Sequence, residues 1–306
     1  MNGNKKFISG HDIAVLAGLP LMTLLAWSTG ENIWSIISRK ISPHIGGIIS
    51  RTPEQLQNRI LQVMHNCEIC SSPLEIARQL AAHEIETSLQ IMRAHFPNGW
   101  RPNIELQGEE HLELALNRGK GAILWDSHFY FASLVTKMGL HERGYKIYHL
   151  SRREHGFSST AFGMSVLNPI RTMVEKRYLR ERLVIPIENP GRILKELADR
   201  LSQNSIVSIT VRGESKQPVE TPFFNGQLKI APGAPVLSWN TGAALLPVFT
   251  IRRNIGEFLI RIGPVISVSQ ELERKKAVKT AALAYAKYLE PVVLAEPGQW
   301  VDWINI

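Results

Sequence analysis

Two cysteines are all that this chain of 306 residues contains, and both lie in the segment from His65 to Cys70. A structural zinc site takes about four ligands, and Cys67 and Cys70 have no second pair to complete one, so we predict no metal site. A redox pair of this spacing normally lies in a thioredoxin-like βαβ unit, whereas this pair lies between helical stretches. We interpret both as structural or incidental thiols, and so few cysteines favour a reducing compartment.

The sequence also lacks blocks of basic residues, internal repeats and low-complexity linkers, although its formal net charge is +8. A scattered positive charge favours a membrane phospholipid surface, a phosphorylated substrate or an acidic carrier protein as partner, and we predict no nucleic acid. Its 44% hydrophobic and 20% charged residues are ordinary for a globular protein and exclude disorder as the main state. The length allows one large α/β domain.

No apolar run is long enough for an ordinary membrane-spanning helix, which needs about 20 residues. The longest run, residues 13–27, is interrupted by Pro20. No small-x-small cleavage site follows it, which argues against a signal peptide. Residues 32–50 combine isoleucines and a tryptophan with two basic residues, a pattern typical of a helix lying in a membrane interface. Residues 10–50 are therefore predicted to associate with a membrane, and the alternative is a hairpin buried against the main domain.

Beyond this segment the pattern is that of an α/β protein. Residues 52–97 predict two helices, and from residue 104 predicted strands and helices alternate. The predicted strands are 104–106, 122–125, 146–150, 183–187, 206–211, 218–221, 245–251 and 258–262, and the helices are 109–118, 129–139, 160–180, 190–203, 230–242 and 270–289. We thus divide the chain into an N-terminal membrane-associating segment, residues 1–50, and an α/β domain, residues 51–306.

The residues most suited to a catalytic role follow the apolar run at 122–125. A Gly-x-Gly turn leads into this run, which reads as a buried strand and ends in Asp126, Ser127 and His128. A histidine at the carboxyl end of a buried strand lies where α/β sheets place ligands and reacting groups. The alternative is that Asp126 or Ser127 caps the next helix and His128 is an ordinary first-turn residue.

Two later loops carry charged residues directly after predicted strands. Arg152 and Arg153 follow the strand at 146–150, and Arg212 and Glu214 follow the strand at 206–211. Paired arginines can clamp a phosphate through two hydrogen bonds, although solvated surface charge is the alternative. Lys229 stands just before the predicted helix 230–242, and a helix N-terminus with a nearby lysine can bind an anion.

In their order and spacing these segments resemble the lysophospholipid acyltransferase superfamily. Within it the nearest branch is that of the bacterial lauroyl/myristoyl acyltransferases of lipid A biosynthesis, with the phosphatidylinositol-mannoside acyltransferases as relatives. The resemblance is carried by the N-terminal hydrophobic segment, residues 104–124, the His128 junction, Thr-Pro-Phe-Phe-Asn-Gly at 221–226, Gly-Ala-Ala-Leu-Leu-Pro-Val-Phe at 242–249 and Glu-Pro-Gly-Gln-Trp-Val-Asp-Trp at 296–303. It implies a single glycerolipid-acyltransferase-like α/β domain, with a mixed central sheet flanked by helices.

The resemblance also implies an activity. In such enzymes a His-x4-Asp/Glu motif supplies a histidine as general base on an acceptor hydroxyl and a carboxylate that orients it. The acyl donor is a thioester on acyl carrier protein or coenzyme A, attacked directly, and no cofactor is implied beyond this co-substrate. The acceptor is an anionic lipid or glycolipid at the cytoplasmic face of the bacterial inner membrane, where the enzyme is held peripherally or by a single pass.

The chain departs from that motif, because the fifth residue after His128 is Ser133, which carries no negative charge. Asp126 can replace the carboxylate, since residues two apart on a strand point to the same side, or Glu214 can enter the pocket from its loop. The third alternative is a protein that has lost acyl transfer and only binds lipid or acyl carrier. We favour a working O-acyltransferase in which His128 is the base and Asp126 or Ser133 orients it.

The same resemblance assigns the charged loops to substrate binding. Arg152 matches the family's arginine after the next strand and, with Arg212, Glu214 and Lys229, is expected to bind anionic groups of substrate or carrier. Arg-Gly-Glu at 212–214 replaces an Asp-Gln-Asp-like run of the lipid A enzymes, so the acceptor need not be a lipid A precursor. A hydrolase with Ser127 or Ser133 as nucleophile is the weakest alternative, because the chain has no Gly-x-Ser-x-Gly elbow.

Overall fold

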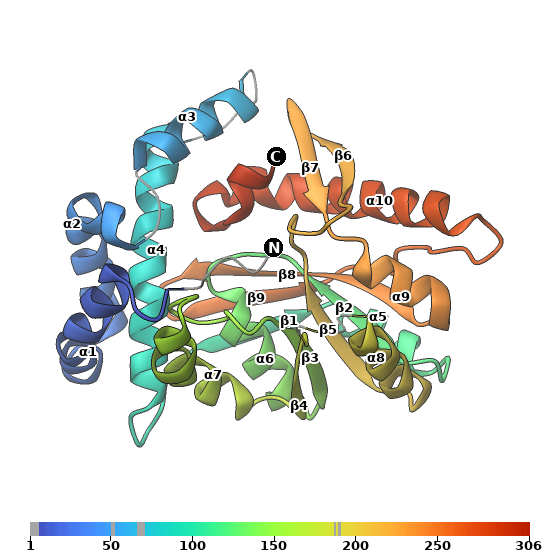
Figure 1. Ribbon diagram of the computed structural model, residues 1–306, viewed down its shortest axis with the longest axis horizontal. Coiled ribbons are helices and arrows are strands. Elements are labelled where there is room, and N and C mark those ends of the chain that lie inside the picture. The colour runs from blue at the N-terminus through green and yellow to red at the C-terminus, as the bar shows by residue number, and fades with distance from the viewer. Residues whose placement is uncertain (1–5, 50–52, 66–70, 187, 189–190) are drawn as a thin grey trace.

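A seven-stranded sheet in the order β1-β9-β8-β2-β5-β3-β4 forms the centre of the computed structural model, which describes residues 6–49, 53–65, 71–186, 188 and 191–306 (Figure 1). Its strands are β1 (Asn103–Gln107), β2 (Ala122–Asp126), β3 (Ile147–Ser151), β4 (Glu181–Val184), β5 (Ile206–Thr210), β8 (Ala244–Asn254) and β9 (Glu257–Ile262). Neighbouring strands are parallel except β8 and β9, which form an antiparallel pair. The predicted fold class, a mixed sheet flanked by helices, is confirmed.

Helices cover both faces and one side of this sheet. They are α1 (Gly10–Ser28), α2 (Glu31–Ile49), α3 (Pro53–Val63), α4 (Pro73–Ala94), α5 (Glu109–Leu116), α6 (Ala132–Glu142), a π-helix (Gly163–Leu167), α7 (Asn168–Lys176), α8 (Arg192–Ser202), α9 (Gly233–Thr241) and α10 (Arg274–Ala295). Two 3₁₀ turns, Pro297–Gln299 and Asp302–Asn305, follow α10 and bring the C-terminus back over the sheet (Figure 1).

Strand β2 is buried along its whole length and divides the core into two layers. Ile123 and Trp125 belong to the cluster that also holds buried residues of α8, α9 and α10, whereas Ala122 and Leu124 belong to the cluster with α5 and α6. The alternation follows from the two-residue period of a strand, and an uninterrupted apolar run is the pattern of a strand buried on both faces. The turn before it requires glycine, since Gly121 has a φ of 71°.

Helix α4 stands at the side of the sheet and carries α1 and α2 on its outer face (Figure 1). The Trp27 indole donates a hydrogen bond to the Met92 carbonyl at 2.9 Å, and Arg93 donates to the Trp27 carbonyl at 2.9 Å. Pro20 lies within α1 without ending it, so the helix extends beyond the apolar run at 13–27. By length and composition α1 could cross a membrane, and only 11% of its most apolar window is buried.

Two elements differ from the predictions. Residues 226–230 form strand β7, which pairs with β6 (Val219–Phe223) as a separate antiparallel hairpin, so the predicted helix at 230–242 begins only at Gly233. Phe224 and Asn225 form the two-residue loop between the strands, and Phe224 has the positive φ of 49° that tight hairpin turns favour. The predicted helix at 160–180 is divided into the π-helix and α7, with Pro169 in the first turn of α7.

Two predictions lie beyond what the structure tests. Cys67 and Cys70 fall within residues 66–70, outside the described part of the chain. The division of the chain at residue 50 stays a prediction, because α1 and α2 pack on α4 while still exposing apolar side chains.

Candidate active site

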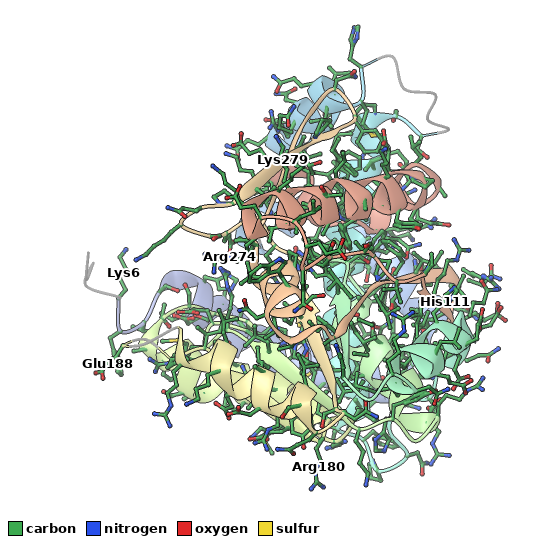
Figure 2. The ribbon with its side chains drawn as sticks, turned by 90° about the vertical axis from the view of Figure 1, so that its right-hand side faces the viewer. Lys6, His111, Arg180, Glu188, Arg274 and Lys279 are labelled. Carbon is green, nitrogen blue, oxygen red and sulfur yellow. The ribbon has the colours of Figure 1, made fainter. Side chains whose placement is uncertain are left out.

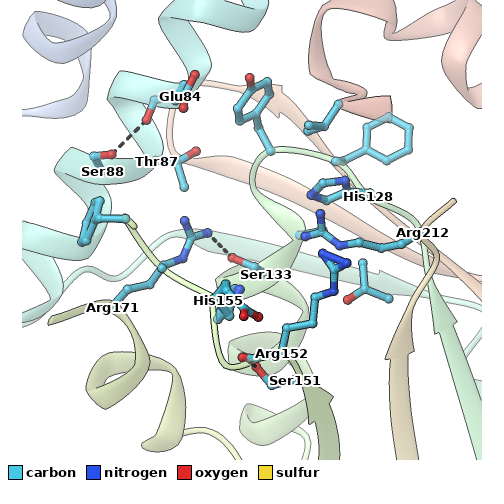
Figure 3. A pocket seen from close by; sticks show the side chains of 18 of the residues that line it. Glu84, Thr87, Ser88, His128, Ser133, Ser151, Arg152, His155, Arg171 and Arg212 are labelled. Carbon is cyan, nitrogen blue, oxygen red and sulfur yellow. Dashed lines mark hydrogen bonds between the residues drawn. The ribbon is translucent and has the colours of Figure 1, made fainter. Parts of the chain in front are cut away.

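A cavity of about 1390 Å³ opens at the carboxyl ends of β2, β3 and β5. One wall is apolar and comes from α1 and α4, with Leu19, Met22 and Leu80 among its residues. The opposite wall is polar and comes from the loops that follow the three strands, with His128, Arg152 and Arg212 (Figure 3). Parallel strands that end at one edge of a sheet bring their following loops together, and α/β proteins bind ligands at this edge. The cavity thus joins a long apolar surface to a charged one.

His128 lies in this cavity two residues beyond the end of β2. Its Nδ1 lies 2.9 Å from Oδ1 of Asp302, and the two side chains are 20% and 9% exposed. Because the Asp302 carboxylate accepts, the imidazole carries its proton on Nδ1 and keeps the lone pair of Nε2 for another partner. In enzymes a histidine base and the carboxylate that orients it are paired in this way.

The C-terminal tail holds Asp302 in place. The Val301 N–H donates to the His128 carbonyl at 3.0 Å, and the Trp303 indole donates to the Pro297 carbonyl at 3.1 Å. Trp303 is fully buried and packs edge-on against Trp300, with ring centroids 5.1 Å apart. Asn305 donates a second hydrogen bond to Oδ1 of Asp302 at 2.8 Å. The tail is therefore anchored on both sides of Asp302.

Burial and the charges around His128 determine its pKa. Burial lowers the pKa of His128, the Asp302 carboxylate raises it, and the positive charges of Arg212 and Arg171 lower it again, which leaves the pKa below its ordinary value. The imidazole is consequently neutral near pH 7. A neutral imidazole with a free nitrogen is the form that can accept a proton.

The sequence predicted Asp126 or Ser133 as the partner of His128, but in the structure the carboxylate at hydrogen-bond distance from its ring belongs to Asp302. Oδ2 of Asp126 accepts a hydrogen bond from Ser208 Oγ at 2.5 Å, and burial raises the pKa of Asp126 to about 6. The rule that residues two apart share a face fails here because β2 ends at Asp126, so His128 lies in a turn rather than on the strand.

Ser133 has a different partner. Its Oγ accepts a hydrogen bond from Nη2 of Arg171 at 2.5 Å (Figure 3). Arg171 belongs to α7 and also contacts Glu175, with Nε 3.1 Å from Oε1. No pattern in the sequence singles out Arg171, because it lies in the middle of a predicted helix rather than after a strand.

Glu175 is the fully buried anchor of this region. Lys137 Nζ lies 2.6 Å from its Oε2, and His155 Nε2 lies 2.9 Å from its Oε1. Burial raises the pKa of Glu175, but the charges of His155, Lys137 and Arg171 outweigh burial and hold the pKa well below its ordinary value. An ionised carboxylate thus fixes three cationic or polar side chains beneath the cavity.

Of the four residues predicted to bind anionic groups, three line the cavity. Arg152 forms an ion pair with Glu214, and both side chains are about half exposed. Arg212 lies beside His128, where burial lowers its pKa and the Asp302 charge raises it (Figure 3). Lys229 does not join them, since it lies on the β6–β7 hairpin with Nζ 3.9 Å from Glu220.

Positive charge outside the cavity is spread over the molecule. The labelled side chains of Lys6, Arg180, Arg274 and Lys279 project from different parts of the surface (Figure 2). Among the described residues no group of three or more His, Cys, Asp or Glu side chains is placed to hold a metal ion.

A comparison with family models places this site within a known group of proteins. The model described as bacterial lipid A biosynthesis acyltransferase matches residues 77–305, which include β2, the His128 loop and the tail with Asp302. The comparison with curated proteins finds no match.

Proposed function

Because the chain belongs to the bacterial lipid A biosynthesis acyltransferase family, we propose that it is an O-acyltransferase with His128 as general base. It transfers a fatty acyl chain from an acyl thioester, carried on acyl carrier protein or coenzyme A, to a hydroxyl of a lipid or glycolipid. The observation that carries the proposal is the hydrogen bond between His128 and Asp302. Asp302 supplies the carboxylate that Ser133 lacks.

The transfer step follows from this pair. Nε2 of His128 accepts the proton of the acceptor hydroxyl while the hydroxyl oxygen attacks the thioester carbonyl carbon. The C–S bond then breaks, and the thiolate leaves with the proton that the imidazolium returns, so the products are an ester and a free thiol. Asp302 stabilises the imidazolium between these events, and in a comparable histidine–carboxylate pair loss of the carboxylate lowers kcat about 10⁴-fold.

The two walls of the cavity suit the two ends of such substrates. The apolar wall formed by α1 and α4 can bury the acyl chain, and each buried methylene contributes about 0.8 kcal/mol. Arg152 and Arg212 are placed to bind anionic groups of the substrate, and Glu214 fixes Arg152 at the rim. Lys229 lies outside the cavity, and we propose that it contacts the acyl carrier protein.

The N-terminal helices support association with a membrane. Apolar residues of α1 and α2 remain exposed, among them Leu21 at 70%, Leu24 at 65% and Ile36 at 55%. Leu21 also lines the cavity, so this surface is continuous with the acyl-binding wall. We propose that the protein binds the cytoplasmic face of a bacterial inner membrane through this surface, and that its lipid substrate enters from there.

A lipid- or carrier-binding protein without turnover was the alternative, and its basis was the missing carboxylate. Asp302 supplies a carboxylate at hydrogen-bond distance from His128, so the geometry favours the enzyme.

The proposal is tested with purified protein, lauroyl thioesters of acyl carrier protein and of coenzyme A, and a bacterial polar lipid extract as acceptor. We expect thiol release coupled to formation of a new ester, and loss of both in His128→Ala. Lys176→Gln, an exposed position on α7, is the control and retains transfer. Transfer at the wild-type rate by His128→Ala would contradict the proposal.

A further inference from the structure

Arg171 presents unused hydrogen-bond donors to the cavity. A guanidinium has five N–H groups, and in the described part of the chain Arg171 uses one on Ser133 and one on Glu175. Its side chain is 19% exposed and lines the cavity. Three of its N–H groups therefore remain for a further hydrogen-bond acceptor.

Arg212 presents a second guanidinium to the same space. Burial lowers its pKa and the charges of Asp302, Arg152 and Arg171 act on it, and within the described residues its side chain forms no hydrogen bond. Figure 3 shows its guanidinium beside His128, with Arg152 pointing toward it. Arg171 and Arg212 both line the cavity, and Figure 3 shows both guanidiniums pointing into it.

Two partly buried positive charges near each other are costly unless an anion joins them. Partial burial makes their repulsion stronger than it would be in water. The single charge of Glu175 is shared among Lys137, His155 and Arg171, and among the described residues no carboxylate forms an ion pair with Arg212, although the Asp302 charge acts on it. An oxyanion between the two guanidiniums would accept hydrogen bonds from both, the arrangement in which arginine binds carboxylate and phosphate most strongly.

The position of Arg171 is fixed before any ligand binds. Glu175 holds its Nε, and Ser133 holds its Nη2. Glu175 is itself held by Lys137 at 2.6 Å and His155 at 2.9 Å in a fully buried cluster. A side chain fixed in this way loses little conformational entropy when a ligand binds. Arg153, a surface arginine in the loop after β3, is exposed and has no such support.

We propose that Arg171, Ser133 and Arg212 form a binding site for an oxyanion of the acceptor, a carboxylate or a phosphate, close to the hydroxyl that His128 activates. The role of that hydroxyl rests on the proposed function, whereas the binding of the anion does not. The anion belongs to the acceptor because the whole pantetheine arm separates the thioester of either donor from its nearest phosphate. The acceptor is thus a lipid with an anionic group next to its reacting hydroxyl.

Direct binding without any acyl donor tests this inference. Isothermal titration calorimetry compares dodecyl phosphate, dodecanoate and the neutral 1-dodecylglycerol, each below its micelle concentration. We expect the wild-type protein to bind at least one anionic probe more tightly than the neutral one, and the tighter of the two anions assigns phosphate or carboxylate. Arg171→Gln should weaken binding of that anion by about 10- to 100-fold, the range for a hydrogen bond to a charged group.

Binding of 1-dodecylglycerol should not change in Arg171→Gln, and Lys176→Gln is the matched control for loss of a positive charge on the same helix. Because Arg171→Gln also removes a partner of Glu175, Ser133→Asp provides a second test that keeps Arg171 in place. The new carboxylate would occupy the guanidinium and weaken anion binding while neutral binding stays the same.

Equal wild-type affinities for anionic and neutral probes would overturn the inference, as would equal losses in Arg171→Gln and Lys176→Gln. Failure of the proposed function gives a different result. His128→Ala is expected to lose acyl transfer but to bind the anionic probe as the wild type does, and a protein without transferase activity can still show the Arg171-dependent preference.

Discussion

Oδ1 of Asp302 lies 2.9 Å from Nδ1 of His128, although 174 positions separate the two residues in the sequence. The histidine follows the central strand β2, and the aspartate lies in the last turn of the chain. The candidate active site is therefore complete only when the C-terminal tail has folded back over the sheet.

Asn305 should position Asp302 rather than take part in the reaction. It donates to the same carboxylate oxygen that His128 contacts, so Asn305→Ala removes one of the two hydrogen bonds that fix this oxygen. A hydrogen bond contributes about 0.5–1.5 kcal/mol, and we expect kcat to fall roughly 2- to 12-fold with KM unchanged. Steady-state kinetics measures both. A change confined to KM would show that Asn305 acts on substrate binding instead.

The pH dependence of transfer should follow the charges around His128. Activity requires the neutral imidazole, so it rises with pH through the pKa of His128, which burial and the two arginines hold below its ordinary value of 6.5. Arg212→Gln removes a positive charge that lowers this pKa and should move the acidic limb of kcat/KM to higher pH. Asp302→Asn removes the charge that raises the pKa and should move the limb of any residual activity to lower pH. Shifts in the opposite directions would contradict this electrostatic account.

Glu175 should stabilise the fold. Glu175→Gln leaves Lys137 buried without its charge partner, and breaking a buried pair costs about 3–5 kcal/mol. Urea denaturation at neutral pH measures the free energy of unfolding. The folded pKa of Glu175 lies well below its ordinary value of 4.5, so this stabilisation is present above pH 4.5 and is lost as pH falls below it. The difference between variant and wild type should therefore shrink in acid. A difference that stays constant with pH would show that packing, not charge, causes the loss.

The exposed face of α1 should carry membrane binding. Leu24 is 65% exposed and does not line the cavity, so Leu24→Asp removes an apolar contact without altering the site. Burial of a leucine contributes about 1.5–3 kcal/mol, and partition into vesicles that contain anionic phospholipid should fall at least roughly 10-fold. Leu114 on α5 is 60% exposed and provides the control, since Leu114→Asp should leave cosedimentation with vesicles unchanged. Equal effects of the two variants would exclude α1 as the membrane-binding surface.

The sequence was sufficient to predict the sheet and one side of the site. A continuous apolar run identified β2, and placement at a strand end identified His128, Arg152 and Arg212 as candidates. These residues meet because β2, β5 and β3 are neighbours in the sheet. Strand order is a tertiary property that the local patterns of the chain do not encode, so their meeting could be expected only from the family resemblance.

The residues that complete the site could not be predicted in this way. Asp302 lies in a short 3₁₀ turn whose place depends on the burial of Trp300 and Trp303. Arg171 lies within a helix, and its contact with Ser133 depends on how α7 packs beside α6. Both belong to segments without an alternating pattern or a strand end. Local periodicity thus located His128 and missed the residues that bond to it and surround it with charge.

The most direct test of the account compares Asp302→Asn with Asp126→Asn in the acyl transfer assay, each alone and with His128→Ala. Asparagine at 302 keeps the size of the side chain but loses the charge that orients and stabilises His128. We expect kcat to fall by up to about 10⁴-fold in Asp302→Asn, and we expect the double variant to be no less active than His128→Ala alone, because residues that act as a unit are not additive. Asp126→Asn should retain most of the activity. Wild-type kcat in Asp302→Asn, or a loss as large in Asp126→Asn, would contradict the assignment of Asp302 as the partner of His128.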